Sequence, residues 1–161
     1  MRAAVLTCSD RCARGEAADT SGPHIVGRLR EAGFEIVELL VVPDDAAAIA
    51  AALRRWADEL GVDVVVTTGG TGFSPRDVTP EATLSVVERR APGIAELVRA
   101  EGLKKTPHAC LSRGEAGLRG NTLIVNLPGS LKAVRDGMDA LVTVLPHAVR
   151  MIAGGDHIRE R

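Results

Sequence analysis

Residues 63–83 read DVVVTTGGTGFSPRDVTPEAT and carry the chain from a buried strand through a glycine loop into a helix. Asp63–Thr68 is apolar on both faces, as expected of a central strand in a parallel sheet. Thr79-Pro80-Glu81 has the features of a helix start: an N-cap threonine, a proline at the first helical position and an acid in the first turn. We therefore expect a strand–loop–helix unit at this point.

The same alternation of strands and helices continues towards both ends of the chain. Apolar and β-branched runs predict further strands at Ala3–Cys8, Phe34–Val42 and Thr122–Leu127. Helical spacing of apolar residues, with glycine or proline near the ends, predicts the helices Ser21–Ala32, Ala46–Leu60, Thr79 to about Arg90, Ile94–Lys104 and one from about Leu131.

Three further segments complete the prediction. Ser9–Thr20 is expected to be a polar loop, and Thr106–Gly120 has no clear periodicity and is assigned no state. Pro146 is expected to interrupt the last helical region, which ends at Gly154-Gly155. The order β-α-β-α-β-α-α-β-α predicts a three-layer α/β/α domain with a mostly parallel central sheet, formed by residues 1–161 as a single domain.

The composition argues against several classes of function. The chain has 161 residues and a net charge of −1, so no excess of basic charge suggests a nucleic-acid or membrane surface. Aromatic residues make up 2%, too few for base-stacking platforms. No apolar run approaches the roughly 20 residues that span a bilayer, and the N-terminus is too short in its apolar part for a signal peptide. We expect neither a nucleic-acid nor a membrane partner.

Cysteine and histidine patterns give no support to thiol, zinc or hydrolase chemistry. The three cysteines, Cys8, Cys12 and Cys110, are too few for a disulfide framework, which favours the reducing cytoplasm. Cys8 and Cys12 lack a second cysteine pair, so we interpret them as structural rather than as zinc ligands. The four histidines show no ligand spacing, and no Gly-x-Ser-x-Gly elbow occurs.

Polar side chains gather where the predicted strands end. Ligands of open α/β sheets bind beyond the carboxyl ends of the strands, so these segments are expected to meet at one edge of the sheet. The four segments are Ser9-Asp10-Arg11, Pro43-Asp44-Asp45, Gly69–Asp77 and Asn126-Leu127-Pro128-Gly129-Ser130.

The run Gly69-Gly70-Thr71-Gly72 lets backbone amides approach a ligand closely, which favours a phosphate or a nucleotide. It is not a Walker loop, because Gly-Lys-Ser/Thr is missing, and Pro75 stands where a dinucleotide fingerprint needs its third glycine. Taken alone, the run fits a tight turn about as well as a binding loop. A second glycine turn, at Asn126–Ser130, favours binding.

Two aspartates accompany these turns. Asp44 follows one strand and Asp77 follows the glycine loop, so together they suggest a Mg²⁺ ion shared with a nucleotide. Each has a simpler alternative. Asp44 fits a helix N-cap, as does Asp45, and Asp77 fits a helix-start acid or an ion pair with Arg76.

Taken together, these motifs closely resemble the signature of the molybdenum-cofactor biosynthesis family, which includes the MogA and MoaB proteins, plant molybdopterin adenylyltransferase domains and the G domain of gephyrin. The resemblance covers essentially the whole chain and implies a molybdopterin-binding-protein-like fold. The matching segments are Ser9-Asp10-Arg11, Asp19-x-Ser21-Gly22-Pro23, Val42-Pro43-Asp44, Thr67–Thr83, Leu111-Ser112-Arg113 and Asn126–Ser130.

The resemblance implies a reaction in which the AMP part of Mg²⁺-bound ATP is joined to the terminal phosphate of molybdopterin, and pyrophosphate is released. Asp44 and Asp77 fall on the family's two essential aspartates, as catalytic residues that organise Mg²⁺ and ATP. Ser112 falls where the family contacts the pterin, and Lys132 fits either a phosphate contact or a surface lysine. The other substrate- and nucleotide-binding candidates are Ser9, Asp10, Arg11, Thr68, Gly69, Gly70, Thr71, Gly72, Arg76, Asn126, Pro128, Gly129 and Ser130.

Two rival functions exist within the same resemblance. Some relatives bind molybdopterin as carriers or scaffolds without efficient adenylyl transfer, but a binding-only chain would be expected to lose an aspartate or the glycine loop. Members of the competence-damage-inducible family use the fold for hydrolase-like chemistry but are usually longer. The resemblance also implies a homotrimer, in some cases a hexamer, that passes its product to a downstream molybdenum insertase.

Overall fold

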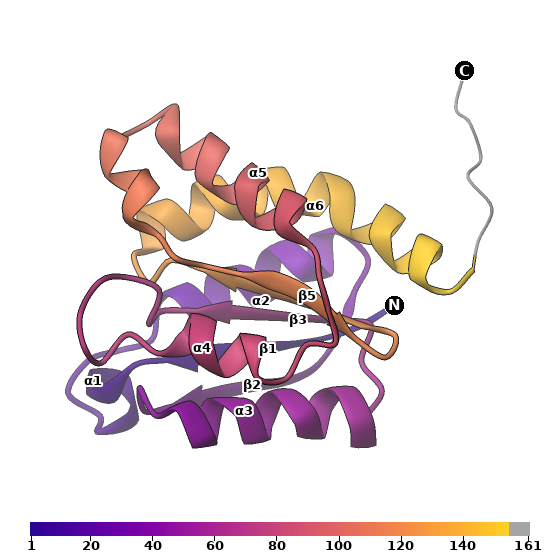
Figure 1. The fold of residues 1–161 in the computed structure, drawn as a ribbon, viewed down its shortest axis with the longest axis horizontal. Helices are drawn as coiled ribbons and strands as arrows, with labels where there is room; N and C mark the ends of the chain where they lie inside the picture. Colours follow the sequence, from indigo (N-terminus) through magenta and orange to yellow (C-terminus); the bar gives the residue numbers. More distant parts are fainter. Residues whose placement is uncertain (155–161) are drawn as a thin grey trace.

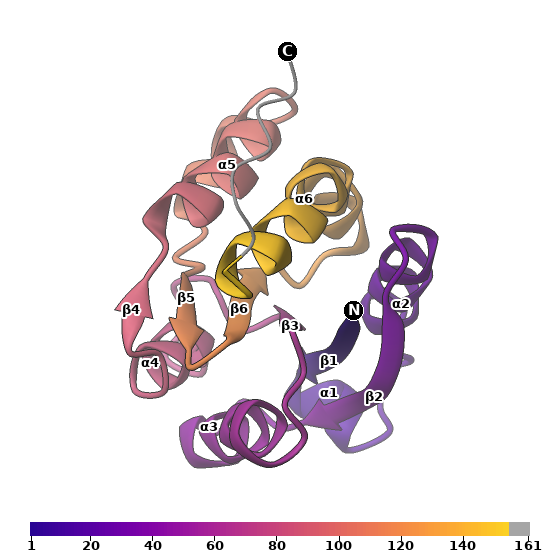
Figure 2. The ribbon, with the colours of Figure 1, turned by 90° about the vertical axis from the view of Figure 1, so that its right-hand side faces the viewer.

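The protein is built around one six-stranded sheet, seen in a computed structural model that describes residues 1–154. The strand order is β2-β1-β3-β6-β5-β4 (Figures 1 and 2). Four strands run parallel, and β5 and β4 add an antiparallel edge. Their bounds are β1 Arg2–Cys8, β2 Glu35–Val42, β3 Val64–Thr68, β4 Arg89–Arg90, β5 Ala116–Arg119 and β6 Thr122–Leu127.

Helices cover both faces of the sheet, as the sequence predicts (Figure 2). One face packs against α2 (Ser21–Glu31), α5 (Pro92–Leu103) and α6 (Leu131–Ile152). The other packs against α3 (Ala46–Arg54) and α4 (Thr79–Leu84). Strand β3 contributes Val64 and Val66 to the first core and Val65 to the second, which explains its continuous apolar sequence. The three-layer α/β/α prediction is confirmed.

The helix predicted from Thr79 to about Arg90 is too long. Helix α4 ends at Leu84, and Arg89-Arg90 forms strand β4. The N-cap of α4 is Val78, whose side chain cannot accept a hydrogen bond from the first turn. Thr79, which was predicted to be the N-cap, is instead the first helical residue. Main-chain pairing with β5 competes with the helix here, since the Glu88 amide donates to Leu118 O at 2.8 Å.

Residues 106–120 hold two short elements that periodicity does not reveal. The 3₁₀ helix η2 (Pro107–Leu111) is capped by the Thr106 side chain, which accepts from the His108 amide. Strand β5 then pairs with β6 in antiparallel register, from Ala116 opposite Val125 to Arg119 opposite Thr122. Elements of four or five residues contain too few positions for a period to show.

Two other predicted boundaries are corrected. Residues 10–13 of the predicted loop form the short helix α1 (Asp10–Ala13), which is capped by the Ser9 hydroxyl. The helix predicted to reach Leu60 ends as α3 at Arg54 and continues as the π-helix η1 (Arg55–Glu59), which carries the buried Trp56.

Pro146 does not interrupt α6, which continues to Ile152. Leu141, Leu145 and Val149 are buried on both sides of the proline, so packing against the sheet holds the helix together across it. The predicted end at Gly154-Gly155 falls partly outside the described residues, since these stop at Gly154. Across residues 1–154, none of the helices has the length and apolar character that crossing a membrane requires.

Candidate functional site

The segments that follow the parallel strands are tied directly to a neighbouring strand or turn. The Ser9 amide donates to Val42 O at 2.9 Å, which joins the ends of β1 and β2. The Thr68 hydroxyl donates to Pro128 O at 2.7 Å, and the Gly69 amide donates to Leu127 O at 3.2 Å. The parallel register of β1, β2, β3 and β6 therefore brings the predicted site segments to one edge of the sheet.

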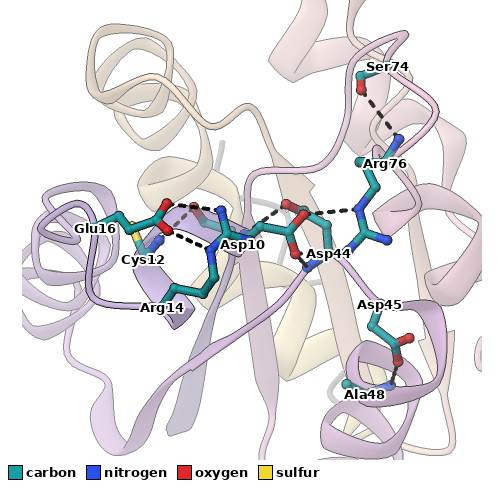
Figure 3. Close-up of polar contacts among 10 residues, drawn as sticks. Asp10, Cys12, Arg14, Glu16, Asp44, Asp45, Ala48, Ser74 and Arg76 are labelled. Carbon is teal, nitrogen blue, oxygen red and sulfur yellow. Dashed lines mark hydrogen bonds and ion pairs between the residues drawn. The ribbon is translucent and has the colours of Figure 1, made fainter.

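At this edge, the main-chain amides of two aspartates each donate a hydrogen bond to the side-chain carboxylate of the other (Figure 3). The Asp10 amide donates to Asp44 Oδ2, and the Asp44 amide donates to Asp10 Oδ1, both at 3.0 Å. Arg76 donates through Nε and Nη2 to the two oxygens of Asp10, at 3.0 and 2.9 Å. Arg76 thus pairs with Asp10, and the predicted alternative of an Arg76–Asp77 pair is wrong for this structure.

Asp44 is the least satisfied carboxylate of the group. Its Oδ1 atom is buried and accepts no hydrogen bond from the described part of the chain. Burial raises the pKa of Asp44 above its usual 3.8, and the charges of Asp10 and Asp77 raise it further, against the lowering effect of the Asp10 amide. Asp45, not Asp44, caps α3 by accepting from the Ala48 amide at 2.8 Å. The N-cap alternative for Asp44 therefore does not hold.

Asp77 belongs to a tight turn after the glycine loop. Its Oδ2 atom accepts from the Ser74 amide at 2.9 Å, and its own amide donates to Ser74 O at 2.9 Å. A Cβ added to Gly72 would lie 2.8 Å from Asp77 Oδ2, so the carboxylate lies against the loop backbone. A side chain at this position would therefore displace the Asp77 carboxylate.

The glycine loop adopts backbone angles that other residues avoid. Gly69 has φ +93° and Gly70 has φ +65°. A Cβ on Gly69 would overlap Cys8 O, and one on Gly70 would overlap Thr79 Oγ1 and lie 3.1 Å from Asp44 Oδ1. At these two positions the loop backbone therefore packs so closely against Cys8, Thr79 and Asp44 that only glycine fits.

Two cavities adjoin along this loop. The larger cavity, of about 430 Å³, lies between the glycine loop, α5, η2 and the start of α6. The smaller cavity, of about 280 Å³, lies between the ends of β1 and β3, the start of α2 and Asp44. Gly70, Asp77 and Gly129 line both, so Asp77 lies in the wall that the two cavities share.

The cavities differ in charge. The larger cavity has Arg99, Lys105 and Lys132 in its lining, with Asp77 and Asp136. The smaller cavity has Asp19, Asp44 and Asp77 and no lysine or arginine among the described residues that line it. The larger cavity suits an anionic group, and the smaller one suits a cation held together with a further anion.

Most of the sequence-predicted site residues line one of the cavities. Arg11 lies outside both linings, and Asp10 and Arg76 support Asp44 from outside them. Asn126 is buried outside both linings. Its side-chain Nδ2 donates to the Thr67 and Thr83 hydroxyls, and its Oδ1 accepts from the Glu115 amide, so it supports the site from within the core. The residues in the linings are Ser9, Asp44, Thr68, Gly69, Gly70, Thr71, Gly72, Asp77, Ser112, Pro128, Gly129 and Ser130.

Several residues of the linings were not predicted as site residues, and Asp19 and Arg99 are two charged examples. Asp19 caps the start of α2 through the Gly22 amide at 2.9 Å and accepts from the Thr7 hydroxyl. Its place in the motif before Ser21-Gly22-Pro23 could have singled it out. Arg99 lies on α5 and donates to Gly114 O at 2.8 Å. Only the packing of α5 against the 112–114 turn reveals it, and no local signal does.

Asp44 and Asp77 are the residues that could hold a Mg²⁺ ion together with the phosphates of a nucleotide. Within residues 1–154, no group of three or more His, Cys, Asp or Glu side chains converges on a point, so this part of the chain forms no complete metal cage. Mg²⁺ is commonly held by one or two carboxylates together with substrate phosphates. The Asp44 Oδ1 atom, which has no partner among the described residues and lies beside Gly70, has the chemistry of such a ligand.

The cysteines are free thiols. Burial raises the pKa of Cys8 to about 12, so this thiol is neutral at physiological pH and unsuited to nucleophilic attack. Cys8 lines the smaller cavity as a packing residue.

The fold and the site define an α/β ligand-binding domain with a two-part site at the carboxyl ends of its parallel strands. A family model for a probable molybdopterin binding domain matches residues 4–147, and the chain belongs to this family of molybdenum-cofactor biosynthesis proteins. The crystal structure of the molybdopterin biosynthesis enzyme MoaB from Thermus thermophilus is similar, with a TM-score of 0.90 and 50% identity. That similarity covers 95% of this chain and 96% of the other.

Curated relatives differ in how much of their length the chain covers. It is 42% identical over 152 residues to molybdopterin adenylyltransferase of Helicobacter pylori strain 26695, covering 93% of this chain and 86% of that enzyme. It is 46% identical over 156 residues to the molybdenum cofactor synthesis protein cinnamon of Drosophila melanogaster. That match covers 96% of this chain but only 26% of the fly protein, so the chain corresponds to about a quarter of that relative.

Proposed function

We propose that the protein is a molybdopterin adenylyltransferase, which transfers AMP from Mg²⁺-bound ATP to the terminal phosphate of molybdopterin and releases pyrophosphate. The observation that carries the proposal is Asp77 in the wall between a cationic and an acidic cavity, with the partnerless Asp44 oxygen nearby. A relative 42% identical over most of its length has this activity in its name.

The chemistry matches a site without a general base. A phosphate monoester is already ionised near pH 7, because its second pKa is near 6. It attacks the α-phosphorus of ATP, a P–O bond forms, and the bond to the departing pyrophosphate breaks. The chain must align two anions and offset their repulsion, which requires backbone amides, cations and a metal rather than a Ser-His or Cys-His pair.

Each cavity has a proposed occupant. Molybdopterin occupies the larger cavity, where Ser112 lies and where Arg99, Lys105 and Lys132 offset the charge of its phosphate. The ATP phosphates lie along Gly69–Gly72 and reach the smaller cavity, where Asp44 and Asp77 hold the Mg²⁺ ion. When bound, that ion supplies charge neutralisation to the phosphates as they react. Asp77, in the shared wall, then faces the point where the two substrates meet.

Replacing Asp77 with Asn tests the proposal. We expect AMP transfer to fall by at least about a hundredfold, because electrostatic groups at the reacting centre contribute on that scale. Molybdopterin binding and the melting temperature should stay close to wild type. The control is Asp45→Asn, which removes the same charge from an exposed N-cap where asparagine caps equally well. Full activity in Asp77→Asn, or its unfolding, would remove Asp77 from the proposed role.

A molybdopterin carrier or scaffold is the alternative function. The chain keeps both aspartates and the glycine loop, which favours the enzyme. The homotrimer, with the hexamer as a variant, and the transfer of the product to a molybdenum insertase belong to the same proposal and rest on the family resemblance. The cytoplasmic location also belongs to it and rests on the small number of cysteines.

A further inference from the structure

Arg113 makes contacts at both ends of the loop that carries Asp77. Its main-chain amide donates to Thr71 O at 2.8 Å. Its side-chain Nε donates to Gly72 O at 2.8 Å, and Nη2 donates to Asp77 O at 2.7 Å. One residue therefore binds carbonyls at the beginning and the end of the segment 71–77, although it lies more than thirty residues away in sequence.

The remaining face of the guanidinium binds the helix that follows the loop. Arg113 Nη1 forms an ion pair with Glu81 in the first turn of α4. This contact lowers the pKa of Glu81, so the carboxylate is ionised at neutral pH. The Arg113 side chain is 34% exposed and Glu81 is 55% exposed, so the charge pair itself contributes little stability. The two carbonyl contacts are the more informative part of the arrangement.

The turn that carries Arg113 is itself held from two sides. Arg99 on α5 donates to Ser112 O at 3.3 Å and to Gly114 O at 2.8 Å. Asn126 at the end of β6 accepts from the Glu115 amide at 3.1 Å. Arg113 therefore projects from a turn fixed to a helix and to a central strand. It connects this rigid support to the loop that carries Asp77.

We propose that Arg113 is a positioning residue, which holds the segment Thr71–Asp77 in the conformation that places the Asp77 carboxylate in the wall between the two cavities. Arg113 is not among the residues that line either cavity, so it acts through the loop. The kinetic part of this inference rests on the proposed adenylyl transfer, whereas the conformational part does not.

The geometry calls for arginine. A planar guanidinium donates in several fixed directions at once, and Arg113 uses them on two carbonyls and one carboxylate. A lysine keeps the positive charge near Glu81, but it cannot span the Gly72 and Asp77 carbonyls with the same fork. Arg113→Lys therefore keeps the positive charge beside Glu81 but removes the paired hydrogen bonds to the Gly72 and Asp77 carbonyls.

The test compares Arg113→Lys with Arg119→Lys. Arg119 is a control with the same kinds of contact, because it also binds one carboxylate, that of Asp58, and it binds one main-chain carbonyl, Val86 O at 3.0 Å, where Arg113 binds two. It lies at the opposite end of the sheet, beside Thr122 where β6 begins. The two variants lose the same kind of contacts, so a purely structural effect should be similar in both.

Amide hydrogen exchange gives the readout that does not depend on activity. The amides of Ser74, Asp77 and Thr79 are hydrogen-bonded within the loop segment and report on its order. We expect them to exchange about tenfold faster in Arg113→Lys than in Arg119→Lys, at comparable melting temperatures. Equal exchange in the two variants would overturn the proposal, whatever the enzyme assays give.

Kinetics supply the second readout. In Arg113→Lys we expect kcat for AMP transfer to fall about ten- to a hundredfold, the scale of a misplaced catalytic group, with KM for molybdopterin changed less than about threefold. Arg119→Lys should match wild type. Equal kinetics in the two variants would count against the role in positioning. If the wild type transfers no AMP, the proposed function fails, and hydrogen exchange still decides whether Arg113 holds the loop.

Discussion

At the scale of single residues, Asp44 is one of the two proposed Mg²⁺ ligands, and burying its charge is unfavourable for the fold. Its Oδ1 atom is buried without a partner among the described residues, and Asp10 and Asp77 add negative charge nearby. A carboxylate that the free protein holds at a cost is expected where a ligand later supplies the missing partner.

Asp44→Asn should therefore leave the protein at least as stable as wild type at neutral pH. Asparagine can still accept from the Asp10 amide, and the buried charge is removed. Mg²⁺-dependent ATP binding should be lost, as measured by titration calorimetry. Asp45→Asn, which changes the same charge one residue away, should retain that binding. A clear loss of stability in Asp44→Asn, with binding retained, would make Asp44 a structural residue.

The same residue predicts how stability depends on pH. The pKa of Asp44 is raised in the folded protein above its usual 3.8, so the folded state binds its proton more tightly than the unfolded state does. The contribution of Asp44 to stability is therefore largest below 3.8 and decreases as the pH rises through the raised pKa. We expect the unfolding free energy of Asp44→Asn relative to wild type to increase over this interval and then become constant.

Chemical denaturation of both proteins across that pH range measures the difference. A difference that is independent of pH would mean that the Asp44 pKa is unperturbed. Mg²⁺-dependent ATP binding by the wild type should weaken as the pH falls through the same interval, because protonation of Asp44 competes with the metal.

At the scale of elements, the glycine loop can be tested by comparing two glycines of similar backbone conformation. Gly70 has φ +65° and Gly120 has φ +53°. Either one replaced by alanine costs about 1 kcal/mol for the left-handed backbone alone. A Cβ at Gly120 meets nothing within 4 Å, whereas one at Gly70 meets Thr79 and Asp44.

Gly70→Ala should therefore destabilise the protein more than Gly120→Ala and abolish ATP binding, whereas Gly120→Ala should bind normally. Thermal unfolding and calorimetry of both variants measure this. Normal ATP binding by Gly70→Ala would mean that the loop is only a turn, which is the alternative that the sequence left open.

The elements also show where sequence reasoning works. The strands β1, β2, β3 and β6 were predicted closely, because long apolar runs with clear breaks define them. The end of α4 was misplaced because pairing between residues 88–90 and β5 overrides local helical preference. Strand β5 was missed because a strand of four residues has no readable period. Pro146 lies inside α6 because packing on both sides of it outweighs the lost hydrogen bond.

At the scale of the whole molecule, the convergence of the candidate site segments at one edge of the sheet could be predicted, but the division of the space there into two cavities could not. Parallel strands end at one edge, so Asp10, Asp44, Asp77 and Gly129 had to lie near one another. The charges of the cavities depend on α5 and α6, which bring Arg99 and Lys132 to the same space. The Arg113 contacts likewise join segments more than thirty residues apart, which no local pattern encodes.

The division into two cavities also bears on the choice between enzyme and carrier. A carrier needs one binding cavity, whereas transfer between two substrates needs two that adjoin. In this molecule Gly70, Asp77 and Gly129 line both cavities, so substrates placed in them would meet at Asp77. The arrangement favours transfer.

Adenylyl transfer itself is best tested by the release of pyrophosphate from Mg²⁺-bound ATP, with and without freshly prepared molybdopterin. We predict that release depends on molybdopterin, that it stops when Mg²⁺ is chelated, and that the AMP appears on the pterin. Tight binding of molybdopterin with no pyrophosphate would contradict the proposed function and would mean that the protein carries the pterin without adenylylating it.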